Sequence, residues 1–136
     1  MLGLFSDAFD DPELYLNRPP SDAHLTSLLT RDTFTAADAF VEGPMVGGLT
    51  GYVLPTFEQE RSEFYIYDLA VAQDFRRQGI ATALLTTIRH VAEQRGIHVI
   101  DVQADYGDDP AVALSTKLGS REDAMHFDIL PRQHST

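Results

Sequence analysis

The sequence of 136 residues contains no cysteine. Without thiols the chain forms no disulfide bond, presents no thiolate nucleophile and cannot bind zinc through sulfur. Its five histidines show no spacing typical of metal ligands, so we expect no metal site. Any chemistry must therefore use oxygen atoms, nitrogen atoms or main-chain groups.

Long hydrophobic runs are also absent, since none approaches the ~20 apolar residues that cross a bilayer. The first residues, MLGLFSDAFDD, turn acidic early and include no basic region, so they do not resemble a secretory signal. We therefore expect a cytoplasmic protein without a membrane partner. With 43% hydrophobic and 23% charged residues, the chain is typical of a single globular domain spanning 1–136.

Basic residues are scarce, with 10 Lys and Arg against 21 Asp and Glu, and the net charge is -11 at pH 7. A field of this sign repels the phosphates of nucleic acids and attracts cations. We therefore expect no nucleic-acid partner. Two interpretations stay open: an acidic surface that only keeps the protein in solution, and a site for a polycationic substrate.

The first half of the chain has the periodicity of one helix and three strands. Leucines spaced three and four residues apart after a Ser-Asp cap predict a helix over 21–30. Two β-rich runs, 34–41 and 46–56, flank the turn-rich residues 42–45 and predict a hairpin. A run rich in aromatic and branched residues predicts a third strand over 62–72.

In the second half, one apolar stripe predicts a helix that begins near Ile80 and stops before Gly96; its members are Ile80, Leu84, Ile88 and Val91. A strand is expected over 97–105. The segment 108–119 has Asp at the cap, Pro110 at the first helical position and Gly119 past the end of a helix. Residues 122–130 have the pattern of a last strand. This order predicts an α+β fold with a mixed sheet and a crossover between the third and fourth strands.

The junction between the third strand and its helix has the features of an anion site. A helix N-terminus offers unpaired N–H groups and a partial positive charge, and small residues such as Gly79 and Ala81 leave it accessible. Arg76 and Arg77 add formal charge, which suits a pyrophosphate. The alternative is an ordinary turn with solvated arginines. The sequence lacks both the P-loop motif of nucleotide hydrolases and the dinucleotide fingerprint.

The segment LAVAQDFRRQGIATALL resembles the acetyl-coenzyme A signature of the GNAT superfamily of N-acetyltransferases. Its loop pattern, Arg/Gln-x-x-Gly-x-Gly/Ala, is matched by Arg76, Gly79 and Ala81. Longer stretches such as VQADYGDDPAVAL and REDAMHFDI are similar to the aminoglycoside 3-N-acetyltransferases of the gentamicin-modifying type, and the similarity extends from Phe34 onward. The resemblance implies the GNAT fold, with the third and fourth strands splayed apart, and a homodimer.

The same resemblance implies that acetyl-coenzyme A (acetyl-CoA) is the co-substrate. Main-chain groups of Leu69 and Val71 would pair with its pantetheine arm, and the Val71 N–H would lie near the thioester carbonyl. The diphosphate would be held by main-chain amides of the loop and first helical turn, namely those of Arg76, Arg77, Gln78, Gly79, Ile80, Ala81 and Thr82. Ser115 belongs to this cofactor set because it stands where the superfamily usually has a tyrosine that protonates the departing thiolate.

The attacking amine must lose a proton, and Asp68 is the first candidate for the base. The alternative is that Asp68 is a strand-end carboxylate satisfied by backbone donors. Tyr106 could protonate the thiolate in place of the missing tyrosine. The expected substrate-binding residues are Asp68, Asp105, Tyr106, Asp108 and Asp109.

Other roles remain open for several of these side chains and their neighbours. Asp108 or Asp109 would also serve as the helix cap, and Asp109 is favoured in that role. Glu63 is a weaker substrate candidate. Tyr65 and Tyr67 either line the cleft or pack on the sheet, and packing is favoured.

The chain departs from the superfamily pattern at two places. Ser115 is a poorer acid than tyrosine, so we expect reduced activity. The residues before the first predicted helix contain no strand pattern, so the first strand of the fold is expected to be missing.

These observations favour an acetyl-CoA-dependent N-acetyltransferase that modifies the 3-amino group of a gentamicin-type aminoglycoside. Transfer would be direct, because no cysteine can carry the acetyl group. One alternative is an enzyme with another small cationic amine or polyamine, or a protein N-terminus, as its substrate. The other is a non-catalytic acyl-CoA-binding protein.

Overall fold

The computed structural model of the chain describes residues 20–104 and 109–132. The chain divides into two compact units, of which the first ends at Gln103 and the second begins at Ala104. The expectation that a first strand is missing concerns residues 1–19 and lies outside the described residues. No described helix is long and apolar enough to cross a membrane.

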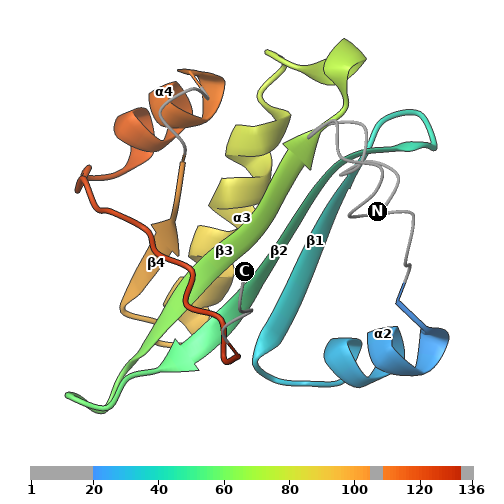
Figure 1. The fold of residues 1–136 in the computed structure, drawn as a ribbon. Coiled ribbons are helices and arrows are strands. Elements are labelled where there is room, and N and C mark those ends of the chain that lie inside the picture. Colours follow the sequence, from blue (N-terminus) through green and yellow to red (C-terminus); the bar gives the residue numbers. More distant parts are fainter. Residues whose placement is uncertain (1–19, 105–108, 133–136) are drawn as a thin grey trace. The chain divides into compact units, whose positions relative to one another are not determined.

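The first unit is built on a four-stranded sheet in the order β1-β2-β3-β4 (Figure 1). Its strands are β1 (Phe34–Phe40), β2 (Met45–Pro55), β3 (Ser62–Val71) and β4 (Val99–Val102). Strand β2 pairs antiparallel with both β1 and β3, whereas β3 pairs with β4 in parallel. The prediction of an α+β fold with a mixed sheet is confirmed.

Helix α3 (Ile80–Gln94) makes the crossover from β3 to β4 and covers one face of the sheet (Figure 1). Its buried residues are Leu84, Ile88 and Ala92, so Ala92 continues the stripe in place of the expected Val91. The spacing of four residues keeps these three side chains on one face. Gly96 follows the helix with a φ of 68°, and the N–H of Ile97 donates to the carbonyl of Ala92 at 2.8 Å. The predicted glycine stop is confirmed.

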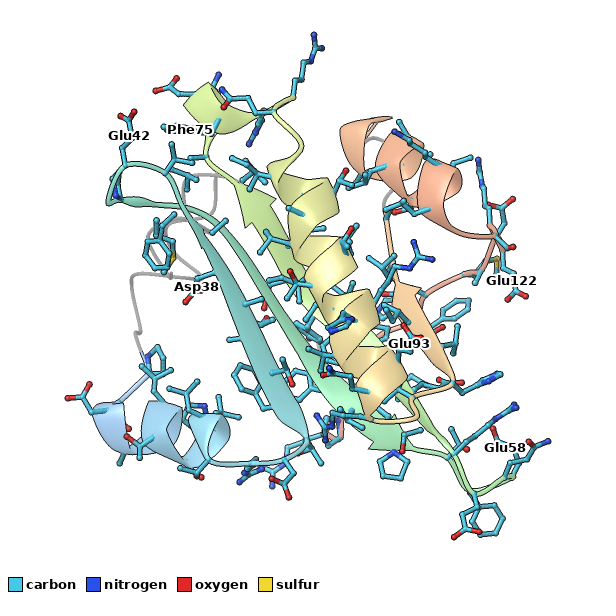
Figure 2. All side chains as sticks on the ribbon, turned by 180° about the vertical axis from the view of Figure 1, so that it is seen from behind. Asp38, Glu42, Glu58, Phe75, Glu93 and Glu122 are labelled. Atoms are coloured by element: carbon cyan, nitrogen blue, oxygen red, sulfur yellow. The ribbon has the colours of Figure 1, made fainter. Side chains whose placement is uncertain are left out.

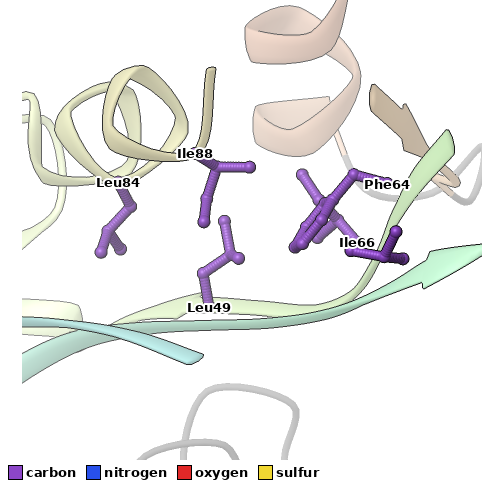
Figure 3. Close-up of a cluster of buried hydrophobic side chains, with 6 residues drawn as sticks. Leu49, Phe64, Ile66, Leu84 and Ile88 are labelled. Carbon is purple, nitrogen blue, oxygen red and sulfur yellow. The ribbon is translucent and has the colours of Figure 1, made fainter. Parts of the chain in front are cut away.

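The core lies between α3 and the sheet (Figure 3). Five of its members are drawn there with labels: Leu49, Phe64, Ile66, Leu84 and Ile88. Gly51 permits this packing, because a Cβ atom at this position would lie 2.4 Å from the ring of Phe64. A larger residue at Gly51 would displace Phe64, the largest fully buried side chain among the described residues.

The hairpin and the first helix form as the sequence predicts. The turn between β1 and β2 contains two residues with positive φ, Glu42 at 55° and Gly43 at 112°. Helix α2 (Asp22–Leu29) precedes β1, and the Ser21 side chain caps it by accepting from the N–H of His24 at 3.2 Å.

The second unit contains helix α4 (Asp109–Leu118), followed by Gly119 as predicted. The helix begins at Asp109, one residue before the expected start. The prediction of a last strand over 122–130 is wrong, because these residues belong to no strand and Met125, Phe127 and Ile129 are exposed. Alternating apolar residues fit a strand but do not supply the neighbouring strand that its main chain must pair with.

Candidate functional site

The candidate site begins where β3 continues beyond its partner. The parallel pairing of β3 with β4 ends at Ile66 and Val102, whereas β3 runs on to Val71. Strand β4 is therefore shorter than the expected 97–105, and no described strand pairs with Leu69–Val71 on this side. The pairing of the described residues therefore ends near the place where the resemblance implies a splay.

The exposed edge of β3 presents the main-chain groups of Leu69 and Val71. On the other edge, the N–H of Ala72 donates to the carbonyl of Val46 at 2.8 Å. Successive residues of a strand point their N–H and C=O groups to opposite edges. The N–H and C=O groups of Leu69 and Val71 therefore point away from β2. The Val71 carbonyl accepts from the Arg76 Nε at 3.2 Å.

A short loop with two left-handed residues leads from β3 to α3. It contains the 3-10 turn η2 (Gln73–Phe75), then Arg77 with a φ of 64° and Gly79 with a φ of 79°. Gly79 is the N-cap of α3 and provides no side-chain cap. The first N–H groups of a helix have no intrahelical acceptor, and alternating backbone conformations turn neighbouring amides toward a common point. The loop can therefore hold an anion.

The anion-binding features lie at one end of the sheet. Figure 2 shows Phe75 of η2 at the same end as Glu42 of the β1–β2 turn, and Glu58 at the other end. Arg76, Arg77, Gln78 and Gly79 are exposed, while Ile80, Ala81 and Thr82 are half-buried at the start of α3. The structure thus brings together the residues predicted to hold the diphosphate.

Asp68 lies on β3 at an irregularity of the strand pairing. Thr50 is opposite Asp68 and Gly51 is opposite Ile66, so Tyr67 is the additional residue of a bulge. The Thr50 hydroxyl donates to Asp68 Oδ2 at 2.7 Å, and Thr50 is only 8% exposed. This contact orients the Asp68 carboxylate. Sequence reasoning missed Thr50, since only the register of β2 and β3 brings it beside Asp68.

The remaining predicted site residues belong to other parts of the chain. Asp105, Tyr106 and Asp108 lie outside the described residues, and the side chain of Asp109 is also not described. Ser115 is half-buried on α4, in the second unit. The expected convergence of these residues with Asp68 therefore stays a prediction.

A cavity of about 420 Å³ lies at the other end of β3, bordered by Val53, Arg61, Ser62, Arg95 and Ile97. Because Ser62 begins β3 and Val71 ends it, this cavity is not part of the candidate site. Among the described residues no group of three acidic or histidine side chains could hold a metal ion.

Comparisons with solved structures place the fold among known acetyltransferases. The chain is similar to an aminoglycoside acetyltransferase from an uncultured soil metagenomic sample, with 50% identity and a TM-score of 0.93 over 96% of this chain and 88% of that one. A second such enzyme from an uncultured soil metagenomic sample, in complex with sisomicin, is 33% identical with a TM-score of 0.88, over 96% of this chain and 86% of that one.

A more distant match supports the fold alone. It is AAC(6')-Iy in complex with the bisubstrate analogue CoA-S-monomethyl-acetylneamine, at 16% identity, with a TM-score of 0.74 over 96% of this chain and 91% of that one. No curated protein sequence matches the chain. The model of the acetyltransferase (GNAT) family matches residues 2–119. The match includes the strand, loop and helix of the candidate site, and the chain belongs to the GNAT acetyltransferase family.

Proposed function

We propose that the protein is an acetyl-CoA-dependent N-acetyltransferase that acetylates the 3-amino group of a gentamicin-type aminoglycoside and so confers resistance to it. The observation that carries this proposal is the 50% identity, over 96% of the chain, to an aminoglycoside acetyltransferase. The open edge of β3 and the uncapped start of α3 supply the local geometry that the reaction needs.

The described residues fit acetyl-CoA. The main-chain groups of Leu69 and Val71 can pair with the pantetheine amides as an added strand would. The loop from Arg76 to Gly79 and the first turn of α3 can hold the diphosphate through N–H groups and two arginine charges. When bound, the co-substrate supplies an activated acetyl group with a thiolate as leaving group.

Two groups on β3 would act on the acceptor amine and the thioester. Asp68, oriented by Thr50, takes a proton from the amine so that the nitrogen lone pair can attack. The Val71 N–H points to the open edge, where it can stabilise the charge that develops on the carbonyl oxygen. A preorganised donor of this kind contributes about 3 kcal/mol to transition-state stabilisation.

The resemblance also implies roles for residues beyond Gln103. The family model runs from residue 2 to residue 119, across the boundary at Gln103 and Ala104, which supports one acetyltransferase domain over the whole chain. Within it, Asp105, Asp108 and Asp109 would bind ammonium groups of the substrate. Tyr106 or water would protonate the thiolate, because Ser115 stands where the superfamily usually has a tyrosine for this role. A Ser115→Tyr variant should then turn over faster, and an unchanged kcat would contradict this role. We also infer a homodimer, which light scattering on the purified protein tests.

The function is tested by mixing the protein with acetyl-CoA and gentamicin and following the release of free thiol. Release with gentamicin, and an acetyl group on the 3-amino nitrogen by NMR of the product, support the proposal. Acetylation at another position would refute the 3-amino assignment. Release with spermidine but not gentamicin would favour another amine substrate, and binding of acetyl-CoA without release would favour a non-catalytic binding protein.

A further inference from the structure

Aromatic side chains from three strands form a continuous row on the sheet face opposite the core. The aromatic row consists of Phe34 on β1, Tyr52 on β2, and Tyr65 and Tyr67 on β3. Phe34 and Tyr52 have ring centroids 5.4 Å apart, Tyr52 and Tyr67 6.0 Å, and Tyr65 and Tyr67 6.1 Å. All three pairs meet edge to face, which is a favourable geometry for aromatic rings.

The bulge at Tyr67 brings Asp68 to the face that carries the aromatic row. In a regular strand, Tyr65 and Asp68 would point to opposite faces. The additional residue at Tyr67 lets Tyr65, Tyr67 and Asp68 all lie on the face that carries Tyr52 and Thr50. The ring of Tyr67 packs against those of Tyr52 and Tyr65 on the sheet, as favoured from the sequence, yet the residue remains 69% exposed. An exposed phenol ring next to the proposed base is available to a ligand.

Carboxylates flank the aromatic row on both sides. Asp68 lies beside Tyr67 in the chain, and Asp101 on β4 is in register with Tyr65. Glu63, two residues before Tyr65, is hydrogen-bonded to Asp101. This contact, with the nearby charge of Asp101, raises the pKa of Glu63 above 4.5. Two acidic groups held so close attract a cation, while the anionic diphosphate of acetyl-CoA is repelled from this surface.

We propose that the aromatic row is a subsite for a polycationic amino sugar, one ring of which lies on the tyrosines. Ammonium groups on different rings are directed to Asp68 on one side and to Glu63 and Asp101 on the other. The apolar C–H face of the sugar ring lies on the tyrosine rings, and the ammonium groups gain from both the ring faces and the carboxylates. This inference rests on the proposed function and names residues for its amine-sugar site that the sequence did not favour.

The decisive variant is Tyr67→Ala. It should raise the KM for gentamicin about three- to tenfold, with kcat and the KM for acetyl-CoA nearly unchanged, because it removes a surface on which the sugar rests before and during reaction. Tyr67→Phe keeps the ring and should restore the KM. Phe57→Ala is the matched control, since Phe57 is 103% exposed in the β2–β3 turn, away from the row, and its loss should leave the KM for gentamicin unchanged.

Saturation-transfer NMR gives a readout that does not require turnover. Irradiation of the protein's aromatic protons should transfer saturation to the ring protons of bound gentamicin, and Tyr67→Ala should reduce that transfer. If the wild-type enzyme acetylates gentamicin while Tyr67→Ala leaves the KM and the transfer unaltered, the subsite is wrong and the proposed function stands. An equal rise in the KM for acetyl-CoA would show general damage and would also overturn the subsite. If wild-type protein neither binds nor acetylates gentamicin, both proposals fall.

Discussion

At the scale of single residues, the contact between Thr50 and Asp68 is the feature with the clearest chemical consequence. The hydroxyl and carboxylate oxygens lie 2.7 Å apart, with Thr50 buried at 8% exposure. A buried donor that holds one carboxylate oxygen fixes the direction from which Asp68 can receive a proton. Thr50 would therefore be a positioning residue, while Asp68 touches the substrate.

We expect Thr50→Val to lower kcat/KM for gentamicin about tenfold, since the loss of a hydrogen bond to a charged group is close to 1.4 kcal/mol in size. The loss should fall on kcat rather than on the KM for gentamicin, because Thr50 orients the base and does not touch the substrate. Thr50→Ser should keep kcat and KM near those of the wild type.

The control for this prediction is Thr35→Val, a threonine-to-valine change on β1, where Thr35 pairs with Gly51 rather than facing Asp68. Equal losses of activity in Thr50→Val and Thr35→Val, shared between kcat and KM and not restored by Thr50→Ser, would assign Thr50 a purely structural role.

At the scale of elements, α3 has a left-handed glycine at each end. Gly79 has a φ of 79° and Gly96 a φ of 68°, and a Cβ atom would meet nothing within 4 Å at either position. An alanine at either position would therefore be strained only by its left-handed backbone conformation, which lowers the free energy of unfolding by about 1 kcal/mol. The two ends differ in function, because only Gly79 shapes the proposed diphosphate site.

Gly79→Ala and Gly96→Ala should thus lower the melting temperature by similar amounts. Only Gly79→Ala should raise the KM for acetyl-CoA, since the N–H groups at the start of α3 no longer converge as well on the diphosphate. Melting curves and initial rates measure the two effects. A KM for acetyl-CoA that is equal in both variants would remove Gly79 from the cofactor site.

The pairing of β3 with β4 has a predicted pH dependence of its own. The hydrogen bond between Glu63 on β3 and Asp101 on β4 raises the pKa of Glu63 above 4.5. The negative charge of Glu58 raises this pKa further by a smaller amount, and the positive charge of Arg61 lowers it. Because the folded-state pKa is the higher one, this contribution to stability is complete below about pH 4.5 and is lost as the pH rises through the raised pKa. Above that pH two neighbouring carboxylates repel each other.

Glu63→Gln should therefore gain stability relative to the wild type as the pH increases from about 4 to about 7, because the amide carries no charge. The melting temperatures of both proteins across this range measure the gain. Glu93→Gln, which changes an exposed glutamate on α3, is the control and should give a curve parallel to that of the wild type. Parallel curves for Glu63→Gln would contradict the prediction.

Most elements could be predicted from the sequence because their signals are local. The cap at Ser21, the stop at Gly96 and the β-rich runs of the hairpin each depend on a few adjacent residues. The tail over 122–130 and the length of β4 could not be predicted, because a strand exists only where another strand pairs with it. The loop at Gly79 was found from its small residues, whereas Thr50 and the aromatic row depend on a register and a bulge that no local pattern specifies.

At the scale of the whole molecule, the net charge of -11 acts on the two substrates in opposite directions. An aminoglycoside carries several positive charges and is attracted, while acetyl-CoA is an anion and is repelled except near Arg76 and Arg77. Salt screens both interactions, with a Debye length of about 10 Å at 0.1 M. The general acidity of the chain thus favours encounter with the cationic substrate, and the two loop arginines offset it locally for the anionic one.

We therefore expect the KM for gentamicin to rise as the salt concentration increases from about 0.01 to about 0.3 M, and the KM for acetyl-CoA to stay level or fall. Arg77→Gln should raise the KM for acetyl-CoA most strongly at low salt. Under that condition the acidic protein repels the anionic cofactor most strongly, and the charge of Arg77 offsets that repulsion. Arg89→Gln, on the exposed surface of α3, removes the same formal charge away from the loop and is the control. Initial rates with each substrate varied at several salt concentrations measure these effects. A KM for gentamicin that does not depend on salt would mean that the acidic surface serves solubility rather than substrate capture.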